Sequence, residues 1–133
     1  MNVQRDILSW IAFFKPVCAD LSEVNLKLPY ADLLVANLLI EYIGYECFQN
    51  AVKTVHPKYV SCIIQINKDT SFVSDSPYLH VFDRLDEIHH QIQEDELAGA
   101  MQKIGYISGT TDVYDLPNGK KLVRLDFINS ALR

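Results

Sequence analysis

The sequence has few of the features that stabilise or define several common classes of small protein. Among its 133 residues are three cysteines, Cys18, Cys47 and Cys62, without a C-x-x-C pair, so neither a disulfide framework nor a zinc knuckle is indicated. The five glycines fit no phosphate loop, dinucleotide fingerprint or nucleophile elbow. We therefore expect three buried, reduced thiols and neither a metal nor a cofactor.

Clustered positive charge and long apolar runs are also absent. The net charge is −5, and no basic run is longer than Lys120-Lys121, which argues against nucleic-acid binding. The apolar run from Leu33 to Ile43 is well short of the ~20 residues that cross a bilayer. Asp6 and Lys15-Pro16 interrupt the one stretch that could serve as a signal peptide. We expect one cytoplasmic domain spanning residues 1–133, without membrane contact.

The densest apolar segment runs from Pro29 to Val55 and predicts a long helix. Proline suits the first helical position, and Pro57 disfavours helical geometry at His56, where the helix should end. The polar stripe changes sides near Gly44, so the helix either bends there or has a first half that is buried all round.

The other elements follow from hydrophobic periodicity. On a helical projection, apolar residues that fall within an arc of about 120° predict two more helices. A strict two-residue alternation of side chains predicts a strand with one buried face. In chain order we expect helix Val3–Leu21, either kinked at Pro16 or divided there into two short abutting helices, strand Tyr59–Ile66, helix Pro77–Gln93, helix Asp95–Ile104 and a β-hairpin over Tyr106–Ile128. This order predicts a helix-rich α+β domain with a small antiparallel sheet.

The hairpin register follows from its turn. Pro117 cannot donate the hydrogen bond that would close a two-residue Asn118-Gly119 turn. A three-residue loop with Gly119 in the left-handed region uses each residue as its geometry prefers. That loop places Asp115 opposite Lys121, Val113 opposite Val123 and Asp112 opposite Arg124.

His89 and His90 are the strongest candidates for chemistry, with Asp83 and Asp86 one to two turns earlier on the expected helix. Helical projection places His89 within the apolar stripe and His90 about 100° away, so the two rings cannot readily share a ligand. A packed His89 beside a solvated His90 is the structural interpretation. The functional alternatives are a ligand or metal site on the Asp86/His90 flank, or a pH-sensitive contact.

From Pro29 onward, the expected order of helix, strand, two helices and hairpin resembles the winged-helix arrangement. In that fold the helix Asp95–Ile104 would enter the major groove, yet its first turn is acidic and Lys103 is its only cation. The resemblance therefore implies DNA binding that is weak or lost.

With no assembled catalytic motif, we expect a small, non-catalytic interaction or regulatory protein that self-associates as a homodimer and binds a protein partner. Residues expected at the self-association surface are Trp10, Phe14, Leu34, Leu38, Leu39 and Tyr42. One alternative is a winged-helix-like nucleic-acid-binding regulator. Another is a small-ligand-binding protein or enzyme with a pocket near His89 and His90.

Overall fold

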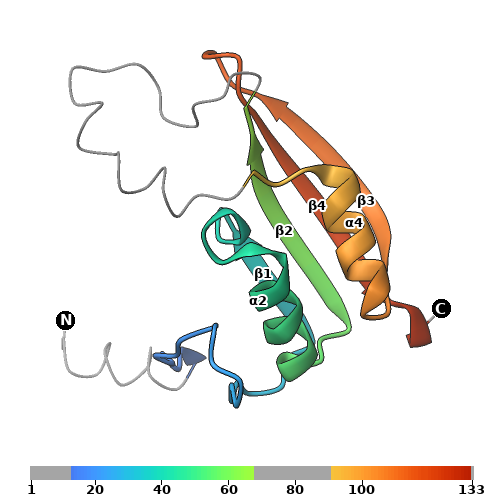
Figure 1. The fold of residues 1–133 in the computed structure, drawn as a ribbon. Helices are drawn as coiled ribbons and strands as arrows, with labels where there is room; N and C mark the ends of the chain where they lie inside the picture. Colours follow the sequence, from blue (N-terminus) through green and yellow to red (C-terminus); the bar gives the residue numbers. More distant parts are fainter. Residues whose placement is uncertain (1–12, 68–90, 133) are drawn as a thin grey trace, which may run out of the picture.

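The structure is a computed structural model that describes residues 13–67 and 91–132 (Figure 1). These residues form four strands, two longer helices and a short 3-10 helix. In chain order they are β1 (Leu33–Asn37), α2 (Ile40–Val55), β2 (Tyr59–Ile66), α4 (Glu94–Lys103), β3 (Tyr106–Asp115), β4 (Lys121–Asn129) and the 3-10 helix Ser130–Leu132.

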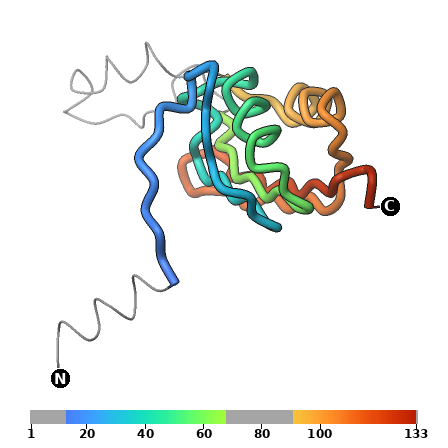
Figure 2. Tube along the Cα trace, turned by 90° about the horizontal axis from the view of Figure 1, so that it is seen from below, coloured from blue at the N-terminus to red at the C-terminus, as the bar shows by residue number. Residues whose placement is uncertain are grey.

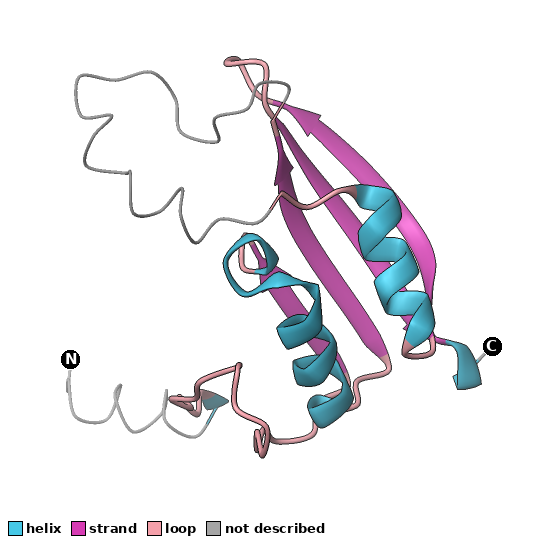
Figure 3. Ribbon diagram, in the orientation of Figure 1, coloured by secondary structure: helices cyan, strands magenta, loops and turns pink. Residues whose placement is uncertain are grey.

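The four strands form one mixed sheet in the order β1-β2-β4-β3 (Figure 3). Strands β1 and β2 are parallel, and α2 is the crossover that a parallel pair requires. Strand β4 lies antiparallel to both β2 and β3, with which it forms the C-terminal hairpin.

Both helices lie on one side of the sheet (Figure 2). Phe48 and Val52 of α2, together with Leu97 and Met101 of α4, belong to the same buried cluster as alternate residues of the strands. On β2 and β4 those alternate residues are Val60, Cys62, Ile64, Val123, Leu125 and Phe127. We call the other side the open face, because no helix of the described segments covers it.

The predicted fold class is wrong. The described residues hold a mixed sheet with a parallel pair and two helices, whereas we expected a helix-rich domain with an antiparallel sheet. The main error lies in Pro29–Val55, whose first part is strand β1. A short apolar run flanked by Asp32 and Asn37 has the same periodicity as a buried helical segment, and only its pairing with β2 distinguishes the two.

Several boundaries in this region were nevertheless correct. Gly44 departs from helical geometry inside α2, with φ 79° and ψ 171°, which confirms the break that the polar stripe indicated. Helix α2 ends at Val55, and His56 follows in a left-handed conformation with φ 53°. The transition from strand to helix, which the sequence did not reveal, occurs at Leu38, whose φ is 55°.

The hairpin prediction is confirmed in its register. Asp115 pairs with Lys121, Val113 with Val123 and Asp112 with Arg124. The Gly119 N–H donates to the Leu116 carbonyl at 3.1 Å, and Gly119 has φ 82°.

The remaining expectations divide three ways. Strand Tyr59–Ile66 is confirmed, and helix Asp95–Ile104 is confirmed with both ends displaced by one residue. The helix expected over Val3–Leu21 is wrong for residues 14–21, which are irregular. The rest of that helix, and the helix Pro77–Gln93 up to residue 90, lie outside the described residues.

The expectation of three buried thiols holds for one of them. Cys62 is buried as expected, whereas Cys18 is exposed and Cys47 partly exposed.

Candidate functional site

Polar side chains gather at the edge of the sheet where the two parallel strands end. In open sheets built from parallel strands, ligands bind outside the carboxyl ends of those strands. Here β1 ends at Asn37, and Asn67 directly follows β2. Helix α2 begins at this edge after β1, and the start of α4 borders a hollow of about 310 Å³ that is also lined by Ile66. We call this region the carboxyl edge.

Glu41, in the first turn of α2, is the buried charged residue of the carboxyl edge. Its side chain is 2% exposed. One carboxylate oxygen, Oε2, accepts a long hydrogen bond of 3.4 Å from the Gln65 N–H, while the buried Oε1 has no partner among the described residues. Burial raises the pKa of Glu41, and hydrogen bonds from the main chain at Glu41 and Gln65 partly oppose that shift.

Asn67 supplies the complementary group at the same edge. Its Oδ1 accepts a hydrogen bond of 3.0 Å from Gln65 Nε2, which links the side chains at the end of β2. Its Nδ2 is buried and has no partner within the described part of the chain. A buried donor and a buried acceptor without partners are rare in folded proteins and need a specific explanation, such as a bound group.

Tyr45 joins the two helices beside this edge. Its hydroxyl accepts a hydrogen bond from the Gln93 N–H at 3.1 Å and donates one to Glu96 Oε2 at 2.9 Å. Burial is the largest cause of the raised pKa of Tyr45, so the hydroxyl keeps its proton at neutral pH and remains a donor to Glu96. Tyr45 therefore positions the start of α4 against α2.

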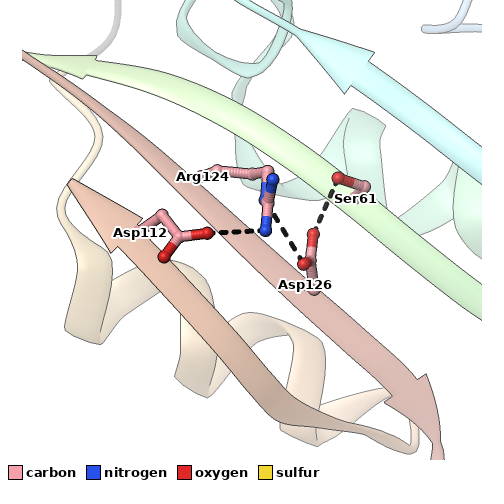
Figure 4. Close-up of polar contacts among 4 residues, drawn as sticks. All are labelled: Ser61, Asp112, Arg124 and Asp126. Atoms are coloured by element: carbon pink, nitrogen blue, oxygen red, sulfur yellow. Dashed lines mark hydrogen bonds and ion pairs between the residues drawn. The ribbon is translucent and has the colours of Figure 1, made fainter. Parts of the chain in front are cut away.

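A second polar cluster lies on the open face (Figure 4). Arg124 Nη2 lies 2.6 Å from Asp112 Oδ2 and Arg124 Nε lies 3.3 Å from Asp126 Oδ2, while the Ser61 hydroxyl donates to Asp126 Oδ1 at 2.7 Å. These residues belong to three adjacent strands. The ion-paired side chains of Asp112, Arg124 and Asp126 are 42%, 36% and 33% exposed, respectively. Each charge has an opposite partner, so the cluster connects β2, β3 and β4.

The site residues predicted from the sequence are not tested by the structure. Asp83, Asp86, His89 and His90 all lie outside the described residues. Within residues 13–67 and 91–132, no group of three or more His, Cys, Asp or Glu side chains could hold a metal ion.

The residues expected at a self-association surface differ in their exposure. Leu34 and Leu39 are partly buried and pack against the core cluster, so they stabilise the fold. Phe14, Leu38 and Tyr42 are 63%, 42% and 37% exposed, respectively. Trp10 lies outside the described residues.

Sequence reasoning missed Glu41 and Asn67. Glu41 falls within the predicted helix Pro29–Val55, and Asn67 falls between the predicted strand Tyr59–Ile66 and the predicted helix Pro77–Gln93. The available signal was the short apolar run before Asn37, which could have been interpreted as a buried strand ending beside the start of a helix. With β1 assigned, both residues would have fallen at the carboxyl ends of parallel strands.

No protein-family model matches the sequence, and no curated protein resembles it significantly in sequence. Solved structures do resemble its fold. One is magnesium protoporphyrin IX methyltransferase from Synechocystis PCC 6803 with bound SAH, with a TM-score of 0.55 and 10% identity over 96% of this chain and 57% of the other. Another is a SAM-dependent methyltransferase from Methanosarcina mazei, with a TM-score of 0.55 and 14% identity over 84% of this chain and 65% of the other.

At these identities the comparisons show the fold, which is that of SAM-dependent methyltransferases. This chain spans less than two thirds of the length of either protein. The winged-helix resemblance is therefore wrong, and the expectation of a non-catalytic, self-associating module or of a winged-helix nucleic-acid regulator is overturned by a fold shared with enzymes. The alternative pocket near His89 and His90 lies outside the described residues and is not tested. In the described part of the chain, no helix is long and apolar enough to span a membrane.

Proposed function

We propose that this chain is a methyltransferase-like polypeptide whose carboxyl edge forms part of the site for S-adenosylmethionine-dependent methyl transfer. The observation that carries the proposal is the coincidence of two features. The sheet has the fold of SAM-dependent methyltransferases, and the edge where ligands bind in such sheets holds the buried, unpartnered groups of Glu41 and Asn67.

The residues present fit such a cofactor in part. S-adenosylmethionine would supply an electrophilic methyl group on a positively charged sulfur, and it also carries an ammonium group. The free Glu41 Oε1 can accept a hydrogen bond from a cationic or donor group, and the free Asn67 Nδ2 can donate one to an acceptor. The five glycines of the sequence match no nucleotide-binding loop, so Glu41 and Asn67 account for only part of a cofactor site.

The role of each residue in this proposal follows from its contacts. Glu41 and Asn67 orient a bound molecule, and Gln65 holds both of them through its N–H and side-chain amide. Tyr45 keeps the start of α4 beside this edge through its bonds to Gln93 and Glu96. A cytoplasmic location suits the proposal. The three free cysteines support that location, because disulfides are rare in the reducing cytoplasm.

The test is a nuclear magnetic resonance titration of the full chain with S-adenosylhomocysteine. Because the described residues of the carboxyl edge offer few groups to the ligand, we expect a dissociation constant on the order of 1 mM. Chemical shifts should change at residues 37–41 and 65–67, and Glu41→Gln should weaken binding severalfold. Glu46→Gln, an exposed substitution in the same helix, is the matched control. Shift changes elsewhere, or none at all, would contradict the proposal.

A further inference from the structure

Two residues with positive φ lie on either side of the short segment that carries Glu41. Leu38, directly after β1, has φ 55°, and Gly44 has φ 79° and ψ 171°. Between them the chain makes a single helical turn over residues 40–43, because Gly44 interrupts the helical geometry of α2. We call residues 40–43 the Glu41 turn. Its direction is set by Leu38 and Gly44, and not by the longer part of α2 that follows Gly44.

Leu38 is held in an unfavourable conformation by its surroundings. A positive φ brings the Cβ of an L-residue too close to its own backbone, and leucine adopts it rarely. The Leu38 N–H donates to the Ile63 carbonyl at 2.8 Å, which continues the main-chain bonds between β1 and β2. On the other side, the N–H groups of Tyr42 and Ile43 donate to the Leu39 carbonyl at 3.0 and 3.3 Å. These bonds fix the backbone before and after Leu38, so the strain persists in the folded protein.

His56 shows a positive φ that secondary structure explains. With φ 53°, it is the other residue besides glycine that has a positive φ in the described part of the chain. Its N–H donates to the Val52 carbonyl at 2.8 Å and ends α2, and a left-handed residue is a common way for a helix to end. Leu38 follows a strand and ends no helix. Strained residues that secondary structure does not explain gather at active sites and ligand sites, so Leu38 calls for a functional explanation.

The consequence of the strain is the position of Glu41. Three residues separate Glu41 from Asn37, the last residue of β1. The Glu41 carboxylate nevertheless lies 3.4 Å from the Gln65 N–H near the end of β2, and Glu41 is 2% exposed. A sharp change of direction at Leu38 lets this short connection return Glu41 to the sheet. The Oε1 atom of Glu41, which has no partner among the described residues, is held in place in the same way.

We propose that Leu38 and Gly44 are positioning residues, whose positive φ values hold the Glu41 turn in the one orientation that presents Glu41 Oε1, together with Asn67 Nδ2, to the bound molecule. This inference rests on the proposed function, because the bound molecule is S-adenosylmethionine or its product. A turn that also adopts other orientations binds more weakly, in proportion to the fraction of the protein that has the competent one. Neither Leu38 nor Gly44 needs to touch the ligand for this role.

The first experiment measures the position of Glu41 in the full chain without a ligand. Leu38→Gly removes the strain and lets the turn adopt other orientations, whereas Leu38→Asn keeps a side chain that tolerates positive φ. In Leu38→Gly the amides of residues 42–43 should exchange hydrogen faster. The pKa of Glu41, measured by carbon nuclear magnetic resonance, should fall toward its ordinary value as water reaches the carboxyl. Leu38→Asn and the matched control His56→Gly should show neither change. Unchanged exchange and pKa in Leu38→Gly, or equal changes in His56→Gly, would overturn the proposal.

The second experiment repeats the titration with S-adenosylhomocysteine on these variants and on Gly44→Ala. The φ and ψ of Gly44 are essentially restricted to glycine, so alanine there forces the turn out of place. Leu38→Gly and Gly44→Ala should raise the dissociation constant about threefold or more, and Leu38→Asn and His56→Gly should stay within about twofold of wild type. Equal constants in all variants would overturn the positioning role and leave the proposed function intact. Absence of binding by wild type would contradict the proposed function, and the first experiment would still decide whether Leu38 positions Glu41. Thermal unfolding checks that each variant is folded.

Discussion

The Glu41 carboxylate and the Gln65 main-chain N–H lie 3.4 Å apart, and this long hydrogen bond connects the start of α2 to the end of β2. It is the only partner of Glu41 that the described residues provide from another element, and it leaves Oε1 without one. A buried carboxyl with incomplete partners favours its neutral form, because the charged form has lost its water. The carboxyl edge is therefore a place where stability and pH are coupled.

That coupling predicts how Glu41→Gln behaves. The raised pKa of Glu41 means that the folded protein binds the proton more tightly than the unfolded chain, whose value is near 4.5. The stability contributed by the neutral carboxyl is present below that value and is lost as the pH rises through the folded pKa. Urea unfolding at pH 4 and pH 7 should show that wild type loses stability relative to Glu41→Gln at the higher pH. The exposed Glu46→Gln should show no such trend, and equal differences at both pH values would mean that Glu41 is not desolvated.

Tyr106→Phe tests the hydrogen bond between Tyr106, at the start of β3, and Pro57, in the loop before β2. The buried Tyr106 hydroxyl donates to the Pro57 carbonyl at 2.5 Å. Removing the hydroxyl leaves that carbonyl without its donor, which should lower the free energy of unfolding by about 1–3 kcal/mol. Tyr114→Phe, at a residue that is 51% exposed, should change it by less than about 0.5 kcal/mol in the same denaturation experiment. Similar losses from the two variants would refute this account.

Alanine substitutions at two glycines should have opposite effects. Gly119 has φ 82°, and a Cβ there would meet no atom within 4 Å, so the cost of Gly119→Ala comes from the backbone alone. We expect a loss of about 1–2 kcal/mol in unfolding free energy. Gly99 lies within α4, and a Cβ there also meets no atom within 4 Å, so Gly99→Ala should stabilise by about 0.5–1 kcal/mol. Thermal or urea unfolding measures both, and a stabilising Gly119→Ala would contradict the left-handed turn.

The three cysteines should differ widely in reactivity. Burial raises the pKa of Cys62 to about 12, so its thiol stays protonated and shielded at neutral pH. Timed alkylation with iodoacetamide followed by peptide mass spectrometry should label the exposed Cys18 first and Cys62 last. Labelling of Cys62 should accelerate to the rate of Cys18 once urea unfolds the chain. Rapid labelling of Cys62 in the folded protein would show that the core around β2 opens locally.

Local patterns in the sequence determined the second half of the fold. The alternation in Tyr59–Ile66, the helix before Gly105 and the hairpin register around Pro117 each depend on residues close together in the chain. Proline and glycine restrict a turn to a few geometries, and a two-residue period identifies a half-buried strand without knowledge of its partners. These parts could be predicted because their physical causes are local.

Only the tertiary structure decided that Leu33–Asn37 is a strand, because its five residues become one by pairing with β2, more than twenty positions further along the chain. That pairing also brings Glu41 and Asn67 to the carboxyl edge and makes β1 the outer strand of the described sheet. Five apolar residues satisfy the periodicity of a helix or a strand equally well. The parallel pairing of β1 with β2, two segments far apart in the sequence, decided that this run is a strand and defined the candidate site.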